Sequence, residues 1–216
     1  MMTKLVIFDL DGTLLNTLSD LAAAANAALV RCGFAARTVD EVQCFVGNGV
    51  EKLLYRALPD GHQTPENLIR MKRAFFAYYD GHLWDKTYPY PGIADLLTRL
   101  QQRGILLAVA SNKYQHAVEK LVEHFFPSVS FAAVLGQQDG LPTKPDPAMV
   151  YQILARAGVP AADALYVGDS DVDMQTAQNA GVRACGVLWG FRSRAVLEKY
   201  HPVYLVNQPQ ILLKWV

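Results

Sequence analysis

Short apolar segments alternate with amphipathic helical patterns along most of this sequence, and this alternation limits the folds that the chain can adopt. The segments predicted as strands are residues 6–8, 105–110, 131–135, 165–167 and 184–187. Helices of about ten residues separate the last four, which is typical of a parallel sheet covered on both faces. We therefore predict an α/β fold whose core is a Rossmann-like, three-layer α/β/α arrangement with a parallel sheet.

A block of helical patterns interrupts the alternation between the first and second predicted strands. Its clearest start signal is Thr38 followed by Glu41, which have the spacing of a capping box. The first strand has no sheet to join by itself, so it belongs with the strands that follow the block. The prediction is a core of residues 1–15 and 86–216, with residues 16–85 inserted as an α-helical domain.

Charge and cysteine content exclude several classes of protein. Lys plus Arg and Asp plus Glu number 20 each, and no basic run typical of nucleic-acid binding occurs. The sequence also has no signal-peptide pattern and no uninterrupted apolar stretch of about eighteen residues. The widely spaced Cys32, Cys44 and Cys185 are interpreted as reduced core thiols. We expect a cytoplasmic protein that binds neither nucleic acid nor membrane, and its oligomeric state, monomer or dimer, stays open.

Polar side chains gather directly after four of the predicted strands. The four segments are Asp9-Leu10-Asp11-Gly12-Thr13, Ser111-Asn112-Lys113, Lys144-Pro145 and Gly168-Asp169-Ser170-Asp171-Val172-Asp173. In an open parallel sheet the carboxyl ends of the strands lie at one edge, where ligands bind. Side chains from distant parts of the sequence are therefore expected to meet in one active site.

The first of these segments says most about chemistry. Alternate side chains of an extended chain share a face, so Asp9 and Asp11 begin on the same side. Two like charges at this spacing are costly unless a cation or a proton intervenes. The pair therefore suggests a divalent metal ion and a carboxylate nucleophile beside a carboxylic acid, although Asp-x-Asp-Gly alone is also an ordinary turn signal.

Taken together and in this order, the four segments resemble the motifs of the haloacid dehalogenase superfamily of hydrolases, in the branch with a helical cap after the first strand. The resemblance extends to Trp189-Gly190-Phe191 and covers essentially the whole chain. Within the superfamily, Phe45-Val46-Gly47-Asn48-Gly49 and Ser111-Asn112-Lys113 are most similar to segments of phosphoglycolate phosphatases. The resemblance implies hydrolysis of a small phosphorylated metabolite, with 2-phosphoglycolate as the favoured substrate.

The resemblance also implies roles for the motif residues. Asp9 is expected to be the nucleophile that forms an aspartyl phosphate, and Asp11 the acid that protonates the leaving group and then activates water. Ser111 and Lys144 would hold the phosphoryl group, and Asn112 would add a hydrogen bond to the substrate. Lys113 stays open between local capping and lining the site.

Magnesium is the cofactor that the resemblance implies. Mg²⁺ would be bound by the carboxylates of Asp9 and Asp169 and by the backbone carbonyl of Asp11, in keeping with its preference for hard oxygen ligands. Asp173 is expected to orient a metal-bound water or Lys144 instead of binding the ion directly.

Substrate selection and reaction type leave alternatives. Gly47, Asn48 and Gly49 are expected to face the active site and bind the substrate, with a simple helix-opening turn as the other interpretation. A sugar-phosphate mutase resembling β-phosphoglucomutase, a pyrophosphatase of the same superfamily, and a signalling module phosphorylated on aspartate are the competing functions. Thr13 argues mildly against the mutase, because mutase relatives resemble a valine version of that turn.

Overall fold

The computed structural model describes residues 3–216, which form two compact units. One unit contains the segment that ends at Asn16 together with Pro89–Val216, and the other is Thr17–Tyr88. Residues 1 and 2, which the predicted core range includes, lie outside the described residues. We call Thr17–Tyr88 the helical insert, and the remainder the core unit.

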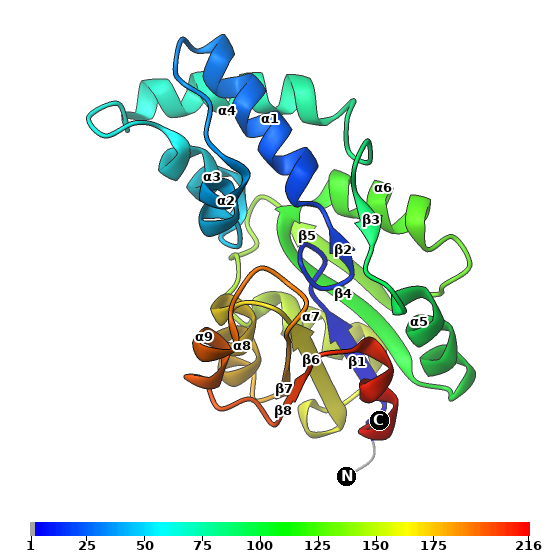
Figure 1. Cartoon of the computed structure of the whole chain (residues 1–216). Helices are drawn as coiled ribbons and strands as arrows, with labels where there is room; N and C mark the ends of the chain where they lie inside the picture. The colour runs from blue at the N-terminus through cyan, green and yellow to red at the C-terminus, as the bar shows by residue number, and fades with distance from the viewer. Residues whose placement is uncertain (1–2) are drawn as a thin grey trace. The chain divides into compact units, whose positions relative to one another are not determined.

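The core unit contains a six-stranded parallel sheet within the described residues, in the order β5-β4-β1-β6-β7-β8 (Figure 1). Its strands are β1 (Leu5–Phe8), β4 (Leu106–Tyr114), β5 (Ala133–Gln137), β6 (Ala164–Gly168), β7 (Arg183–Val187) and β8 (Tyr204–Val206). All four residues of β1 are buried between β4 and β6, because both faces of a parallel sheet are covered. The predicted α/β fold is confirmed, and β8 is an additional edge strand that the sequence pattern did not indicate.

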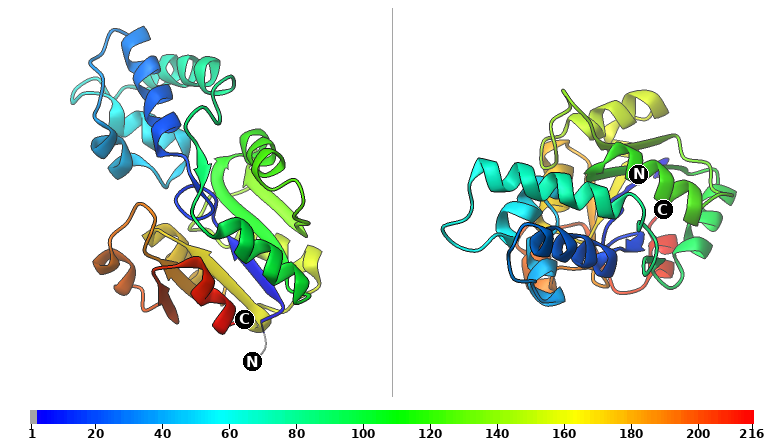
Figure 2. Two further views of the ribbon diagram at one scale, coloured as in Figure 1. Left: turned by 45° about the vertical axis from the view of Figure 1, so that its right-hand side comes forward. Right: turned by 90° about the horizontal axis from the view of Figure 1, so that it is seen from above.

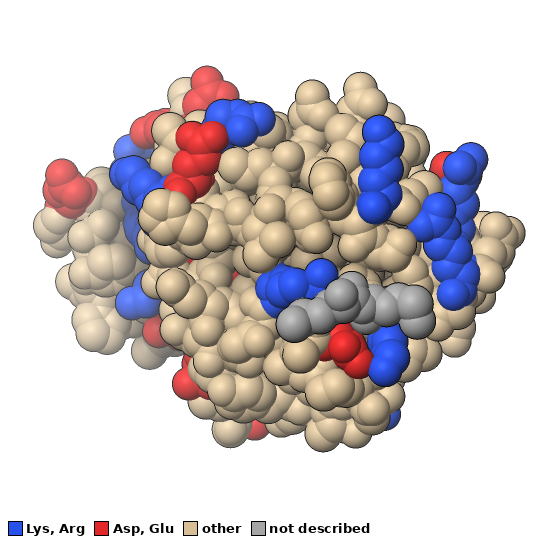
Figure 3. Space-filling view, turned by 90° about the horizontal axis from the view of Figure 1, so that it is seen from below, with Lys and Arg blue, Asp and Glu red and all other residues tan. Residues whose placement is uncertain are grey.

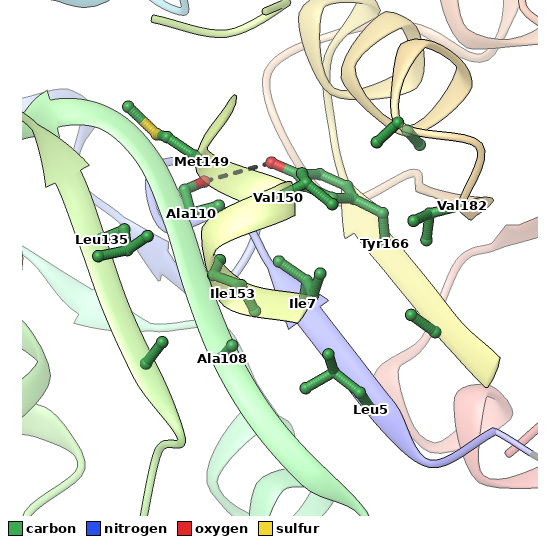
Figure 4. Close-up of a cluster of buried hydrophobic side chains, with 14 of the residues drawn as sticks. Leu5, Ile7, Ala108, Ala110, Leu135, Met149, Val150, Ile153, Tyr166 and Val182 are labelled. Carbon is green, nitrogen blue, oxygen red and sulfur yellow. Dashed lines mark hydrogen bonds between the residues drawn. The ribbon is translucent and has the colours of Figure 1, made fainter. Parts of the chain in front are cut away.

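Helices cover the two faces of this sheet (Figures 1 and 2). The elements between and after the strands are α5 (Ile93–Gln102), α6 (Gln115–Phe125), α7 (Ala148–Ala157), η1 (Ala161–Asp163), α8 (Asp171–Asn179), α9 (Arg194–Glu198) and η2 (Pro209–Lys214). Helices α7 and α8 contribute Met149, Ile153 and Ala177 to a buried cluster that also contains Leu5 and Ile7 of β1 (Figure 4). The other two residues of β1 face the opposite side of the sheet, as the two-residue period of a strand requires.

Strand β4 is longer than the predicted segment 105–110. It pairs with β1 only from Leu106 to Val109 and then continues to Tyr114, with a register shift against β5 after Ala110. The expectation that Ser111-Asn112-Lys113 follows the strand is therefore wrong, because these residues form its carboxyl-terminal part. Their polar side chains have weak strand propensity, and tertiary hydrogen bonds described below keep this part extended.

The helical insert is built from four helices in the order of the chain. They are α1 (Leu18–Arg31), α2 (Val39–Phe45), α3 (Gly49–Ala57) and α4 (Pro65–Tyr79). The predicted capping box is present, since the Thr38 hydroxyl accepts from the Glu41 N–H and the Glu41 carboxylate accepts from the Thr38 N–H. Two short strands, β2 (Leu15–Asn16) and β3 (Tyr88–Pro89), form a separate two-stranded sheet where the chain leaves and re-enters the core unit.

Two further observations concern the charge on the surface and the length and apolar character of the helices. Figure 3 shows that on one face the lysine and arginine side chains lie singly or in small groups, with acidic side chains among them. Within the described residues, no helix combines the length and the apolar character that crossing a membrane requires.

The cysteines differ from one another more than the sequence suggested. All three are free thiols, as expected, but only Cys185 is buried in the core, while Cys32 is half-buried and Cys44 is exposed. The interpretation of all three as core residues is wrong for Cys32 and Cys44, which lie at or near the ends of helices in the insert. Burial in β7 raises the pKa of the Cys185 thiol to about 12, which keeps it protonated and unreactive.

This difference predicts selective thiol chemistry. In the folded protein at mildly alkaline pH, a thiol reagent such as Ellman's should modify Cys44 rapidly and Cys185 only after denaturant unfolds the core. A variant that retains Cys185 as its single cysteine should thus not react until the protein unfolds. Circular dichroism monitors that unfolding. Rapid labelling of this variant in its native state would contradict the buried position of β7.

Candidate active site

The structure brings the four polar segments together at the carboxyl ends of β4, β1 and β6. Asp9 directly follows β1, and Ser111 lies in the part of β4 that extends past the last residue pair with β1. Lys144 comes from the loop between β5 and α7, and Asp169 lies between β6 and α8. Adjacent parallel strands carry these residues to one edge, and the loops that follow the strands complete the cluster.

Lys144 is the centre of this cluster. Its buried ammonium lies 2.9 Å from Asp9 Oδ1 and 2.7 Å from Asp173 Oδ1. It also lies 2.9 Å from the carbonyl oxygen of Ala110 and 3.0 Å from the hydroxyl of Tyr166. One ammonium therefore connects acids that follow two different strands.

The backbone of Lys144 is fixed by Asn112. The Asn112 amide accepts from the Lys144 N–H at 2.8 Å and donates to the Lys144 carbonyl at 3.0 Å. Asn112 was predicted to contact the substrate, whereas these two bonds give it a visible role in placing the lysine loop. The same pair keeps the end of β4 extended.

Tyr166 is part of the cluster and was not predicted from the sequence. Its fully buried hydroxyl donates toward the Ala110 carbonyl at 3.2 Å, drawn as a dashed line in Figure 4, and lies 3.3 Å from Asp173 Oδ1. Burial is the largest cause that raises the pKa of Tyr166 well above its ordinary value, so the phenol stays a neutral donor. Its place in the apolar run 165–167 made it look like a core aromatic residue, and no local signal distinguishes the two roles.

Asp173 is fully buried and held at the start of α8. Its Oδ2 accepts from the Ser170 N–H at 3.1 Å and from the Ser170 hydroxyl at 2.6 Å, while its Oδ1 accepts from Lys144. These bonds form a capping box, because Ser170 in turn accepts from the Asp173 N–H. A Cβ at Gly168 would collide with the Asp173 side chain, so glycine is required for this close approach.

Asp169 is held by two donors from distant loops. The Thr13 hydroxyl donates to Oδ1 at 3.0 Å, and the Phe191 N–H donates to Oδ2 at 2.7 Å. The indole of Trp189 donates to the Thr13 carbonyl at 3.0 Å, which ties the loop after β7 to the turn after β1. The segment Trp189-Gly190-Phe191, noted above only as part of the family resemblance, thereby positions an acid of the cluster.

Electrostatics shows that these acids are crowded. Burial, followed by the charge of Asp173, raises the pKa of Asp9 well above its ordinary value, even though Lys144 opposes the shift. Burial and Asp173 also raise the pKa of Asp169 to about 7, with hydrogen bonds from Phe191 and Thr13 opposing. Burial disfavours the ammonium of Lys144, but Asp173 and Asp9 together hold its pKa well above the usual range. The protein alone therefore compensates only part of the negative charge.

The same acids suit a divalent cation. Asp9, Asp169 and Asp173 are buried, and one carboxylate oxygen from each lies within 4.8 Å of the others. Hard oxygen donors that repel one another are the donor set typical of such a cation, whose charge would lower their pKa values. Of the predicted ligands, Asp9 and Asp169 belong to this group, and Asp173 is its third member.

Asp11 has a different partner from the other acids. Its carboxylate forms an ion pair with Lys113, whose ammonium lies 3.0 Å from Oδ1 and 3.1 Å from Oδ2. The role of the Asp11 backbone carbonyl as a metal ligand stays a prediction. Ser111 is buried, and its hydroxyl accepts from the Lys113 N–H at 3.2 Å.

The predicted substrate residues of the insert form a turn at the start of α3. Gly47 and Gly49 have φ values of 123° and 83°, and Asn48 is the residue that precedes the helix. This local geometry is that of a helix-opening turn, the alternative interpretation of the segment. Substrate contact by Gly47, Asn48 and Gly49 stays a prediction.

Comparisons with known proteins show which family this chain belongs to. The family model of haloacid dehalogenase-like hydrolases matches residues 6–187. The phosphoglycolate phosphatase of Mannheimia succiniciproducens is 33% identical over 219 residues, covering 99% of this chain and 98% of that protein. A crystal structure from Lactobacillus delbrueckii subsp. bulgaricus, provisionally assigned as a phosphoglycolate phosphatase, has a TM-score of 0.93 at 36% identity and covers 100% of this chain and 98% of that one.

A second solved structure gives the same result. A predicted phosphoglycolate phosphatase from Haemophilus somnus has a TM-score of 0.92 at 30% identity, covering 100% of this chain and 98% of that one. The chain therefore belongs to the family of haloacid dehalogenase-like hydrolases.

The packing around Asp169 predicts the effect of one added methyl group. A Cβ at Gly190 would collide with the Asp169 side chain and the Gly12 carbonyl, so Gly190→Ala should displace the acid and lower activity by about 10²-fold. A divalent cation held by Asp9 and Asp169 should raise the melting temperature of the wild-type protein, and Gly190→Ala should reduce that rise. Gly81→Ala is the control, because its Cβ meets only the Tyr78 carbonyl at 3.8 Å. Wild-type behaviour of Gly190→Ala would contradict the role of this loop.

Proposed function

We propose that this hydrolase cleaves small phosphate monoesters through a phosphoryl group carried on Asp9. The observation that carries the proposal is the buried group of Asp9, Asp169 and Asp173, in which Asp9 and Asp173 contact the Lys144 ammonium. A carboxylate held beside fixed positive charge at a ligand-binding sheet edge suits phosphoryl transfer, which depends mainly on positioning and electrostatic stabilisation.

In the first half-reaction, an Asp9 carboxylate oxygen forms a bond to phosphorus as the bond to the leaving oxygen breaks. The Lys144 ammonium, 2.9 Å from Asp9 Oδ1, offsets the repulsion between the nucleophile and the anionic phosphoryl group. Asp173 and Tyr166 hold this ammonium in place through their own contacts with it. Asp11 gives a proton to the leaving alkoxide, which departs as an alcohol.

In the second half-reaction, Asp11 accepts a proton from water while the water oxygen forms a bond to phosphorus. The bond between phosphorus and Asp9 breaks, releasing phosphate and restoring the carboxylate. Ser111 lies in β4 beside this cluster, and we assign its hydroxyl to a phosphoryl oxygen. Asp11 thus donates a proton in the first half-reaction and accepts one in the second.

We infer that the divalent cation of this site is Mg²⁺. Asp9 and Asp169 would hold it, with the Asp11 carbonyl as a further ligand, and when bound it would neutralise charge on the phosphoryl group. Asp173 then orients Lys144, whose ammonium lies 2.7 Å from Asp173 Oδ1.

For the substrate we propose 2-phosphoglycolate, on the strength of full-length similarity to phosphoglycolate phosphatases at about a third identity. The turn Gly47-Asn48-Gly49 is the proposed source of selectivity among small phosphate esters. Several small esters share the phosphoryl end, so selectivity depends on groups that contact the remainder of the molecule.

A phosphate-release screen tests reaction and substrate together. With Mg²⁺, 2-phosphoglycolate should give the highest kcat/KM among 2-phosphoglycolate, sugar phosphates, nucleotides and pyrophosphate, and a chelator should abolish the release. Conversion of a sugar phosphate into an isomer without free phosphate would instead indicate a mutase. Faster release from pyrophosphate than from any ester would contradict the monoesterase proposal.

The nucleophile is tested by Asp9→Asn. The amide cannot attack phosphorus, so kcat should fall by at least about 10³-fold. The fold should persist, because Lys144 keeps its contacts with Asp173, Tyr166 and the Ala110 carbonyl. Asp171→Asn is the matched control, since the Asp171 side chain is 37% exposed and lies outside the acid cluster. Activity of Asp9→Asn close to that of this control would remove Asp9 from its role.

A further inference from the structure

The core unit places two buried lysines beside three acids. The side chain of Lys144 is 2% exposed and serves Asp9 and Asp173, as described above. The side chain of Lys113 is 3% exposed and contacts both oxygens of Asp11. A buried ammonium is costly unless it is paired, so the second lysine also needs an explanation.

The geometry of the second pair is bidentate and well anchored. Both oxygens of Asp11 lie 3.0–3.1 Å from the Lys113 nitrogen, so neither torsion of this short side chain can turn freely. Lys113 lies in the part of β4 beyond its pairing with β1, and its N–H donates to the Ser111 hydroxyl. Asp11 lies in the turn after β1, where its backbone forms an isolated β-bridge with Leu15.

We propose that Lys113 is a positioning residue for the acid–base steps, which it serves by fixing the orientation of the Asp11 carboxyl group. This inference rests on the proposed function, in which Asp11 exchanges a proton with the leaving oxygen and then with water. A general acid must lie within hydrogen-bond reach of the atom that it protonates, and its efficiency depends on that geometry. Lys113 acts through Asp11 and exchanges no proton itself.

The ion pair is compatible with the proton transfer. A protonated carboxyl group carries its proton on one oxygen and keeps acceptor capacity on the other. The ammonium can therefore stay on one oxygen of Asp11 while the other oxygen gives up or receives the proton. The compact ammonium of lysine can keep its contact with one oxygen while the other carries the proton.

Dependence on the leaving group distinguishes this role from a general structural one. An alkoxide needs a proton as it leaves, whereas p-nitrophenolate is a stable anion and leaves without one. In single-turnover experiments, Lys113→Met should slow glycolate release from 2-phosphoglycolate by about tenfold or more, a part of the 10²–10⁴-fold typical of general acid catalysis. The burst of p-nitrophenol from p-nitrophenyl phosphate should change by less than about twofold, because that step does not use the acid.

Three variants complete the test. Lys113→Arg should recover part of the lost rate with 2-phosphoglycolate, because its guanidinium can contact both carboxylate oxygens. Asp11→Asn combined with Lys113→Met leaves no unpaired buried charge, so it should fold and match Asp11→Asn alone in both reactions. Lys199→Met is the control for loss of a lysine, since Lys199 is exposed and lies outside the cluster.

The outcomes separate the inference from the function on which it rests. Equal slowing of both esters by Lys113→Met, or a rate for the double variant well below that of Asp11→Asn, would overturn the positioning role. Absence of phosphate release from either ester by the wild-type protein would overturn the proposed function itself.

Discussion

The interaction on which the site depends is the contact of one buried ammonium, that of Lys144, with Asp9 and Asp173. Ions are rarely buried unless they are paired and hydrogen-bonded, and here the contacts with Tyr166 and the Ala110 carbonyl complete the surroundings of the charge. Removing one acid would leave the ammonium with a single carboxylate partner, and removing the lysine would leave acids that repel one another. The loop that carries Lys144 is therefore coupled to the segments that follow β1 and β6.

The fold makes this arrangement possible through the order of its strands. β1 lies between β4 and β6, so residues that directly follow β1 lie between the contributions of the other two. The apolar character of β1 secures its position in the sheet, and the polar cluster begins where that apolar run ends. Close approach is obtained at Gly168 and Gly190, where a side chain would occupy the space of Asp173 or Asp169.

Much of this could be predicted from the sequence, because the signals were local or periodic. The parallel sheet followed from the alternation of strands and helices, the insert from its capping box, and the meeting of the polar segments from the general geometry of such sheets. Tyr166 and the pairing of Asp11 with Lys113 could not be predicted, since the partners of each lie far away in the sequence. The extension of β4 to Tyr114 was also missed, because tertiary hydrogen bonds override the weak strand propensity there.

The central claim is that Asp9, held beside Lys144, accepts the phosphoryl group. The most direct measurement uses Asp11→Asn, which should slow the attack of water, so that the covalent adduct formed from p-nitrophenyl phosphate accumulates. After an acid quench, peptide mass spectrometry should find one phosphoryl group on the peptide that contains Asp9, in proportion to the nitrophenol released. A nitrophenol burst with the phosphoryl group on another residue, or with no adduct on Asp9, would contradict the account.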